Sequence, residues 1–263
     1  LSVMCMKYRI SVIMGIYNCA DTLIEALESL EAQTYKRFKV VLCDDGSKDN
    51  TLEVAQKWAE THPNYIVIQN EYNMGLNEYV DTEFVARMDG DDRSLPHRFE
   101  QEVKFLDEHP DFAIVSGPMH YFDDNGVFSK GEGCGVVTKQ DFIVGTPFCH
   151  APCMVRREAY EKVGGYTVSS KLLRVEDYHL WFKMYAVGYK GYMLHKPIYE
   201  MRDDRNAVLR RTLKNRMNEA YVKHIGYKMI GLPWWTHIYC LVPIIKGFMP
   251  FWLYRYFHQQ RMK

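Results

Sequence analysis

Short β-branched apolar runs alternate, along the first third of the chain, with segments whose apolar residues recur every three or four positions. The run at 10–16 is typical of a strand covered on both faces. In the segment 22–33, leucine and alanine follow the helical period. Further strands are predicted at 38–43 and 65–69, with a helix capped by Asp49 or Asn50 between them. Because strands alternate with helices, the pattern predicts right-handed crossovers and a doubly wound, mainly parallel sheet of the α/β class.

The alternation continues as far as residue 201. Pro96 suits the first turn of a helix that ends near Glu108, and the Asp-Asp-Asn-Gly turn at 123–126 favours a hairpin after a strand. Strands are also expected at 112–116, 119–122 and 149–155, and helices at 157–163, from 176 onward, and at 207–224; the segments 189–194 and 197–201 complete the compact part. We therefore expect a single sheet with flanking helices, followed by a C-terminal helical extension.

One connection is shorter than this topology requires. Only the loop at 70–77 and residues 78–82 separate the strand at 65–69 from the next apolar run. A parallel crossover usually needs a dozen or more residues, commonly a helix. We hypothesise that a segment is missing between Asn77 and Glu78.

Three groups of carboxylates stand at the ends of predicted elements. They are Asp44-Asp45, Asp89-Gly90-Asp91-Asp92 and Glu176-Asp177. Each alone has an ordinary explanation as a solvated turn or a helix cap. In a doubly wound sheet, however, the first two meet at the carboxyl edge, where ligands bind. Carboxylates this close repel one another unless a cation or water offsets their charge. Such oxygen ligands suit Mg²⁺ or Mn²⁺ shared with substrate phosphates.

Composition narrows the functional classes. The formal net charge is +0 with 25% charged residues, which argues against a nucleic-acid binder that depends on an overall basic field. The seven cysteines are scattered, and no second close pair joins Cys149 and Cys153 to make a zinc site. The first residues lack the charged-then-apolar pattern of a signal peptide, so we expect a cytoplasmic protein or one bound to the cytoplasmic face of a membrane.

The C-terminal segment differs from the rest. Residues 238–257 carry only Lys246 and Arg255 as charges, together with many aromatic residues and two prolines. The length is borderline for a membrane span, and the prolines and the aromatic-plus-basic finish favour an interfacial segment. A core helix packed back on the domain is the alternative. We predict one domain at 1–203 and, at 204–263, a helical extension that associates with the membrane surface.

Five motifs then occur in the order found in a known family. They are Val12–Asn18, Asp44–Asp49, Asn73–Asn77, Ala86–Asp92 and Glu176–Trp181. With these motifs, residues 8–202 closely resemble the family 2 glycosyltransferases of the GT-A fold. The resemblance implies an inverting transferase that uses a nucleotide-diphosphate sugar and a divalent metal, Mn²⁺ or Mg²⁺. Gly15, Ile16 and His179 depart from common residues of the family, and none of these departures removes a catalytic group.

On the donor side, the resemblance assigns residues at the strand ends to the nucleotide. The nucleotide-binding residues that it implies are Tyr17, Asp44, Asp45, Arg87 and Asp89. Tyr17 would flank the base, and Asp45 or Asp44 would hydrogen-bond it. Asp89 and Asp91 match the family's DxD pair, with Asp91 as the direct metal ligand. Arg87 would meet the diphosphate or a neighbouring carboxylate.

On the acceptor side, the resemblance assigns Asp177 as the catalytic base. Trp181 lies one helical turn later, so it is either an acceptor platform or a core residue. His150 and Glu176 are further candidates for contacts with the sugar or the acceptor.

Taken together, the sequence predicts transfer of a sugar, from a UDP-sugar by preference, to a saccharide or a lipid-linked saccharide in surface polysaccharide or glycolipid synthesis. A sugar-phosphate nucleotidyltransferase is one alternative, but residues 10–21 lack the glycine-rich, basic phosphate loop that it would need. A non-catalytic nucleotide-sugar-binding module is another. The presence of Asp89, Asp91 and Asp177 argues against it.

Overall fold

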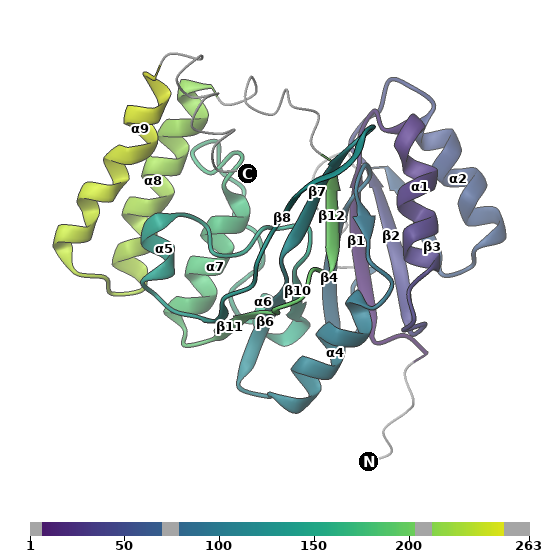
Figure 1. Cartoon of the computed structure of the whole chain (residues 1–263), viewed down its shortest axis with the longest axis horizontal. Helices are drawn as coiled ribbons and strands as arrows, with labels where there is room; N and C mark the ends of the chain where they lie inside the picture. Colours follow the sequence, from purple (N-terminus) through teal and green to yellow (C-terminus); the bar gives the residue numbers. More distant parts are fainter. Residues whose placement is uncertain (1–6, 70–78, 203–211, 250–263) are drawn as a thin grey trace.

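An eight-stranded sheet with helices on both faces forms the centre of the computed structural model, which describes residues 7–69, 79–202 and 212–249 (Figure 1). Its strand order is β3-β2-β1-β4-β10-β6-β11-β9. The strands are β1 (Ile10–Ile16), β2 (Phe38–Asp44), β3 (Tyr65–Gln69), β4 (Phe84–Asp89), β6 (Phe112–Ser116), β9 (Gly135–Val137), β10 (Met154–Arg156) and β11 (Lys190–Met193). Strands β1 to β4 pair in parallel, as do β6 and β11, while β9 and β10 run antiparallel to their neighbours. The predicted mainly parallel α/β sheet is confirmed.

A second, four-stranded sheet corrects the prediction of a single sheet. Its order is β5-β12-β7-β8, with β5 (Arg93–Ser94), β7 (Met119–Asp123), β8 (Gly126–Lys130) and β12 (Tyr199–Arg202). The chain leaves the large sheet after β6 at Gly117-Pro118. A Cβ at Gly117 would lie only 2.6 Å from the Ile198 side chain, so a glycine is needed where β7 crosses beside β12. The predicted hairpin is confirmed, because Asp123 pairs with Gly126.

Helices cover both faces of the large sheet. They are α1 (Ala20–Glu31), α2 (Thr51–Thr61), α4 (Arg98–Glu108), α5 (Asp141–Val144), α6 (Arg157–Lys162), α7 (Glu176–Ala186), α8 (Leu213–Met229), the 3₁₀-helix η1 (Trp234–Cys240) and α9 (Leu241–Gly247). Alternate residues of β1 point to opposite faces: Val12 packs with α1 and α4, and Ile13 packs with α6, α7 and α8. This two-sided burial explains why β1 reads as a continuous apolar run.

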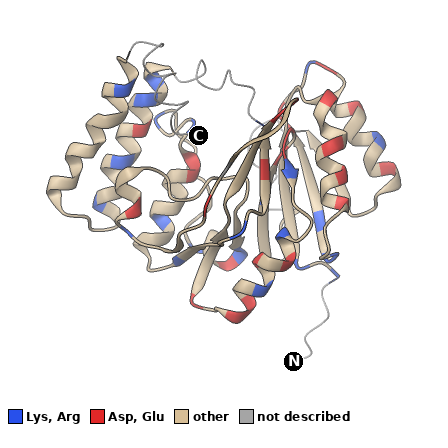
Figure 2. Cartoon of the chain, viewed as in Figure 1, with Lys and Arg blue, Asp and Glu red and all other residues tan. Residues whose placement is uncertain are grey.

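The two flanks differ in charge (Figure 2). Helix α1 carries acidic residues and no lysine or arginine, whereas α8 carries four basic residues and one glutamate. Helix α8 nonetheless buries Val222 and Tyr227 in the same core as α7. The predicted boundary at 203/204 lies outside the described residues, as does the join between Asn77 and Glu78.

Several predicted boundaries differ from the structure. Helix α4 begins at Arg98, so Pro96 precedes it, and α8 extends to Met229. Strand β10 begins only at Met154, because the preceding residues form a turn in which the Cys153 N–H donates to the His150 carbonyl at 3.2 Å.

A buried arginine connects α4 with two strands of the sheet. The Arg98 and Glu102 side chains are both 0% exposed and lie 3.1 Å apart. Arg98 Nη2 also donates to the carbonyls of Arg87, at 2.9 Å, and Ala151, at 3.1 Å. Burial raises the pKa of Glu102, and Arg98 opposes that rise. Arg98 thus supports both β4 and the loop that precedes β10.

Replacing this cation should destabilise the whole domain. Arg98→Met leaves Glu102 and the strand carbonyls without their buried donor, so we expect a loss of about 3–5 kcal/mol in the free energy of unfolding. Urea denaturation measures it. Lys104→Met, an exposed change in the same helix, should stay within about 0.5 kcal/mol. Equal stability of the two variants would contradict the proposed role.

Candidate functional site

The carboxyl ends of three parallel strands meet at one edge. Gly15 of β1 pairs with Cys43 of β2 on one side and with Asp89 of β4 on the other. The loops beyond these strands are tied together, because the Asp45 N–H donates to the Ile16 carbonyl at 3.1 Å. Tyr17, next in the chain, is 56% exposed. The geometry therefore brings Tyr17, Asp45 and Asp89 to one edge of the sheet.

Asn18 holds the loop after β1 in a conformation that few side chains adopt. Its φ is 47°. Its backbone N–H donates to Ser47 Oγ at 3.1 Å, and its Oδ1 accepts from the Lys48 N–H at 2.7 Å. These two bonds cross between the loops after β1 and β2, so they fix the surroundings of Tyr17.

Asp44 has a structural role in this geometry. Its side chain is buried and accepts from the backbone N–H groups of Gly46 and Ser47 and from the Ser47 hydroxyl. These contacts shape the turn after β2 and occupy the carboxylate, which favours a structural role for Asp44 over a contact with the base. Asp45, which is exposed, is left as the candidate for that contact.

The acidic turn after β4 requires the glycine at its centre. A Cβ at Gly90 would lie 2.7 Å from Cys19 Sγ and 3.1 Å from Ile16 Cγ2, so any larger residue would force these side chains to move. The Gly90 carbonyl accepts from Thr22 Oγ1 at 3.2 Å. The close approach fixes the carboxylates of Asp89 and Asp91 on either side.

The carboxylates of this turn face in different directions. Asp89 and Asp91 are exposed, whereas Asp92 is 3% exposed. Asp92 accepts from the Arg202 N–H at 2.8 Å, and burial together with Asp89 and Asp91 raises its pKa to about 8. Tyr199 Oη accepts from the Asp89 N–H at 3.2 Å. Strand β12 thus holds the turn through Asp92 and leaves the other two carboxylates outward.

Asp89 and Asp91 have the donor chemistry of a Mg²⁺ or Mn²⁺ site. Although Asp89 keeps access to solvent, the surrounding protein raises its pKa, Arg87 lowers it, and Asp91 raises it further. The two carboxylates therefore repel each other. A divalent ion held by one or two carboxylates and by substrate phosphates is the usual arrangement for magnesium. The residues fit such an ion.

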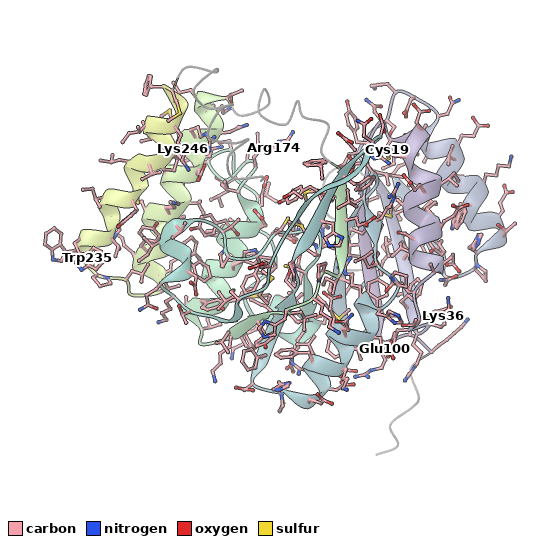
Figure 3. All side chains as sticks on the ribbon, viewed as in Figure 1. Cys19, Lys36, Glu100, Arg174, Trp235 and Lys246 are labelled. Atoms are coloured by element: carbon pink, nitrogen blue, oxygen red, sulfur yellow. The ribbon has the colours of Figure 1, made fainter. Side chains whose placement is uncertain are left out.

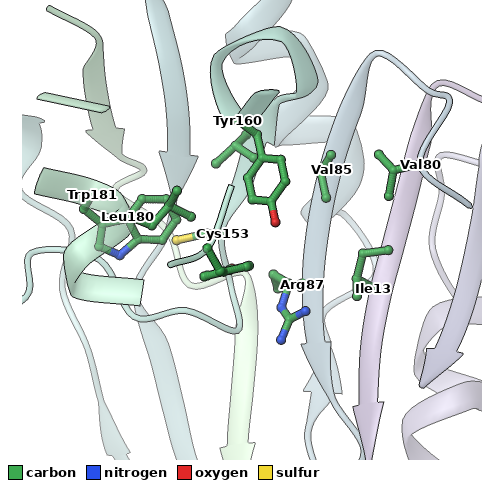
Figure 4. A pocket seen from close by; sticks show the side chains of 10 residues that line it. Ile13, Val80, Val85, Arg87, Cys153, Tyr160, Leu180 and Trp181 are labelled. Atoms are coloured by element: carbon green, nitrogen blue, oxygen red, sulfur yellow. The ribbon is translucent and has the colours of Figure 1, made fainter. Parts of the chain in front are cut away.

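Arg87 lies at the centre of the charged groups. Its Nε is buried without a hydrogen-bond partner among the residues that the structure describes. Figure 4 shows it as the charged member of an otherwise mainly apolar pocket between the sheet and α6 and α7. The Arg87 charge lowers the pKa of Asp89, Asp177 and His150. It is therefore close enough to join the acidic turn electrostatically to the start of α7.

Asp177 lies in the first turn of α7. Burial raises its pKa to about 6; the Tyr178 N–H lowers it, Glu176 raises it, and Arg87 lowers it. Arg174, two residues before the start of α7, has a φ of 71° although it is not a glycine. Figure 3 shows Arg174 and Cys19 near the same end of the molecule.

The acceptor-side candidates separate in the structure. Trp181 is 1% exposed and packs edge-on against Phe148, which favours the core alternative over an acceptor platform. His150 contacts Tyr166 Oη through Nε2, and burial and Arg87 hold its pKa well below the usual range. Glu176 is half-buried beside Asp177.

Sequence reasoning missed the groups that support the site. Tyr199 and Arg98 come from distant parts of the chain, and no local pattern marks them. Arg202 begins a mixed-charge stretch of the sequence, and its Nε donates to the Asp91 carbonyl at 3.2 Å. The remainder of that stretch, 203–211, and the motif at 73–77 lie outside the described residues.

Named relatives share most of the chain. A putative glycosyltransferase, EpsE of Bacillus subtilis, is 36% identical over 97% of this chain and 94% of its own length. The Escherichia coli UDP-Glc:alpha-D-GlcNAc-diphosphoundecaprenol beta-1,3-glucosyltransferase WfaP is 26% identical over 69% of this chain and 72% of its own.

Solved structures show the same fold. Staphylococcus aureus TarS in complex with UDP superposes with a TM-score of 0.66 at 20% identity, covering 91% of this chain and 70% of that one. The mannosyltransferase PcManGT of Pyrobaculum calidifontis, in complex with GDP-Man and Mn²⁺, gives 0.62 at 19% identity, covering 98% and 80%. The family model for glycosyl transferase family 2 matches residues 11–164, which include the acidic turn and end before Asp177. The chain therefore belongs to glycosyl transferase family 2 and has the GT-A fold.

Proposed function

We propose that this glycosyltransferase moves a sugar from a nucleotide-diphosphate donor, UDP by preference, to an acceptor hydroxyl with inversion at the anomeric carbon. One observation carries the proposal. A carboxyl group with a pKa of about 6, Asp177, and the outward carboxylate of Asp89 both lie within electrostatic range of Arg87, and Asp91 lies within range of Asp89. A base and a diphosphate site thus adjoin at the end of the sheet.

The donor assignment rests on the strand-end loops. Tyr17 is exposed beside Asp45, where a base could stack and hydrogen-bond. The likeness to TarS, whose structures hold UDP and UDP-GlcNAc, favours uridine. Arg87 has a buried Nε that lacks a partner among the described residues, and a diphosphate would satisfy it because guanidinium groups bind phosphate oxygens strongly.

Bound at Asp91 and Asp89, Mn²⁺ or Mg²⁺ would offset the negative charge that develops on the departing diphosphate. The chain's own residues supply the rest. Asp177 accepts the proton of the acceptor hydroxyl as that oxygen attacks the anomeric carbon. A single carboxylate base with attack opposite the leaving group inverts the anomeric centre, by the geometry that governs inverting glycosidases.

A pKa near 6 suits this role. The carboxylate is mostly ionised at neutral pH, yet it is more basic than an ordinary aspartate. Arg87 and the α7 N-terminus keep the pKa from rising further, since both favour the charged form. The match of the chain to glycosyl transferase family 2 does not favour the nucleotidyltransferase or the non-catalytic module.

Removing the base should separate catalysis from donor binding. We expect Asp177→Asn to lower kcat by about 100-fold or more, with the dissociation constant for the donor changed little. In the wild type, kcat/KM should fall as the pH drops through about 6, because protonated Asp177 cannot accept a proton. Initial-rate assays of nucleotide diphosphate release across pH 5–8 measure both effects.

Asp141→Asn is the matched control, because Asp141 also lies at a helix start and is outside the site. It should keep transfer within about twofold. Wild-type turnover in Asp177→Asn, or a rate that is flat between pH 5 and 8, would show that another group is the base.

Nucleotide binding should depend on the metal. In calorimetric titrations with UDP, GDP and ADP, we expect UDP to bind most tightly and only with Mn²⁺ or Mg²⁺ present. Asp91→Asn should weaken this binding at least tenfold because it removes a ligand oxygen. Asp111→Asn, an exposed carboxylate beside β6, is the control. Equal binding with and without metal would refute the metal assignment.

We also propose that the acceptor is a lipid-linked saccharide, reached from the cytoplasmic face of a membrane. No helix within the described ranges is long and apolar enough to cross a bilayer. Helix η1, however, exposes Trp234 (86%) and Ile238 (66%), α9 exposes Ile245 (62%), and Trp235 points away from the body of the protein (Figure 3). Basic α8 packs beside them. The name of WfaP includes diphosphoundecaprenol, a lipid carrier of this kind.

Replacing the exposed tryptophans should reduce membrane association. We expect Trp234→Ser with Trp235→Ser to lower co-sedimentation with phosphatidylglycerol vesicles at least fivefold, because tryptophan anchors at the bilayer interface. Val127→Ser with Val168→Ser, which alters two exposed apolar residues outside η1 and α9, is the control. Equal sedimentation of the two double variants would exclude these tryptophans as anchors.

A further inference from the structure

Three side chains that can ligate a metal meet between α8 and η1, apart from the strand ends. They are His224 of α8 and His237 and Cys240 of η1, and their ligand atoms lie within 4.8 Å of one another. Among the described residues, no other three histidine, cysteine or acidic side chains are grouped in this way. His224 is exposed and Cys240 is 8% exposed, so the group opens to solvent on one side only.

The two imidazoles present the same nitrogen to each other. His224 Nδ1 and His237 Nδ1 lie 3.0 Å apart, and the ring planes are inclined at 69°. A single proton between them could satisfy this contact. A cation between them would also satisfy it. Bond lengths to zinc of 2.0–2.3 Å place tetrahedral ligand atoms roughly 3.3–3.6 Å apart. The two nitrogens would therefore separate slightly, and the widest pair of ligand atoms would close by about 1 Å.

We propose that His224, His237 and Cys240 bind a borderline-soft divalent cation of the Zn²⁺ class, with water as the fourth ligand. Imidazole and thiolate select zinc-like ions, whereas the carboxylates of the acidic turn select Mg²⁺ or Mn²⁺. The chain would then hold two metals of different chemistry at two separate places. This inference does not depend on the proposed transferase mechanism.

The nearby positive charges mean that a cation bound here would need the negative charge of the Cys240 thiolate. Lys223 and Lys228 lie within electrostatic range of the group, and they oppose a bare cation. The Lys223 ammonium is held by the carbonyls of Ile143, at 3.2 Å, and Val144, at 3.3 Å. Burial raises the pKa of Cys240, and Lys223 lowers it. A bound ion would displace the thiol proton, and the resulting negative charge would balance the lysines.

The position of the group gives the ion a structural effect. His224 belongs to α8, which is packed on the core, while His237 and Cys240 belong to η1, which also carries Trp234, Trp235 and Ile238. A shared ion would link α8 to η1 through metal–ligand bonds. It would restrain the angle at which the exposed apolar face is held relative to the transferase core.

The test uses Co²⁺ as a spectroscopic substitute for zinc in the full chain without a histidine tag. We expect one ion per chain and a thiolate-to-cobalt charge-transfer absorption in the near ultraviolet that Zn²⁺ abolishes by competition. Cys240→Ser should remove that absorption, and His224→Ala should weaken binding at least tenfold. Because His224 is exposed, its replacement removes a ligand without opening a core cavity. Zn²⁺ should raise the Tm of the wild type and not that of His224→Ala.

Two controls locate the ion. Cys134→Ser, at an exposed cysteine, and Asp91→Asn, at the acidic turn, should leave the absorption unchanged. Absorption that persists in Cys240→Ser, or the absence of stoichiometric binding, would overturn the proposal and leave the pair of histidines as a hydrogen bond only.

Discussion

The arrangement of the site depends on one guanidinium buried beneath it. Arg98 donates to the backbone carbonyl of Arg87, two residues before Asp89, and to carbonyls in the loop that carries His150. It also lies 5.1 Å from the Tyr199 ring, and Tyr199 in turn receives the Asp89 N–H. Unpaired carbonyls are costly in a protein interior. The buried Arg98 guanidinium therefore supports β4, the loop before β10 and the start of β12, and its side chain is 0% exposed.

The carboxylates at this edge of the sheet have two different roles. Asp44 and Asp92 turn inward, where they accept from backbone donors and fix the turns. Asp45, Asp89 and Asp91 turn outward and are exposed. The local sequence is the same kind of acidic doublet in both places. Within each doublet, the carboxylate that turns inward is the one to which neighbours in the folded structure donate hydrogen bonds.

Such tertiary contacts limit what could be predicted from the sequence. The strand at 65–69 and the turn at 123–126 were predicted correctly, because apolar runs and turn residues act over a few positions. The carboxylates at strand ends were placed at one edge because these local signals predict a parallel topology, in which the carboxyl ends of the strands meet. The second sheet and the roles of Arg98 and Tyr199 were not foreseen. Each depends on residues brought together from separations of ten to more than one hundred positions, which no local period reveals.

The backbone at Arg174 has a consequence for how this position tolerates change. Among the described residues, only Asn18 and Arg174 have positive φ without being glycine. Asn18 lies in the loop between β1 and α1, and Arg174 lies just before α7. Asparagine adopts that conformation readily, but arginine does so rarely. Glycine at 174 would fold with less strain. The chain nevertheless carries a guanidinium three residues before Asp177, so an arginine side chain stands at this bend at the cost of backbone strain.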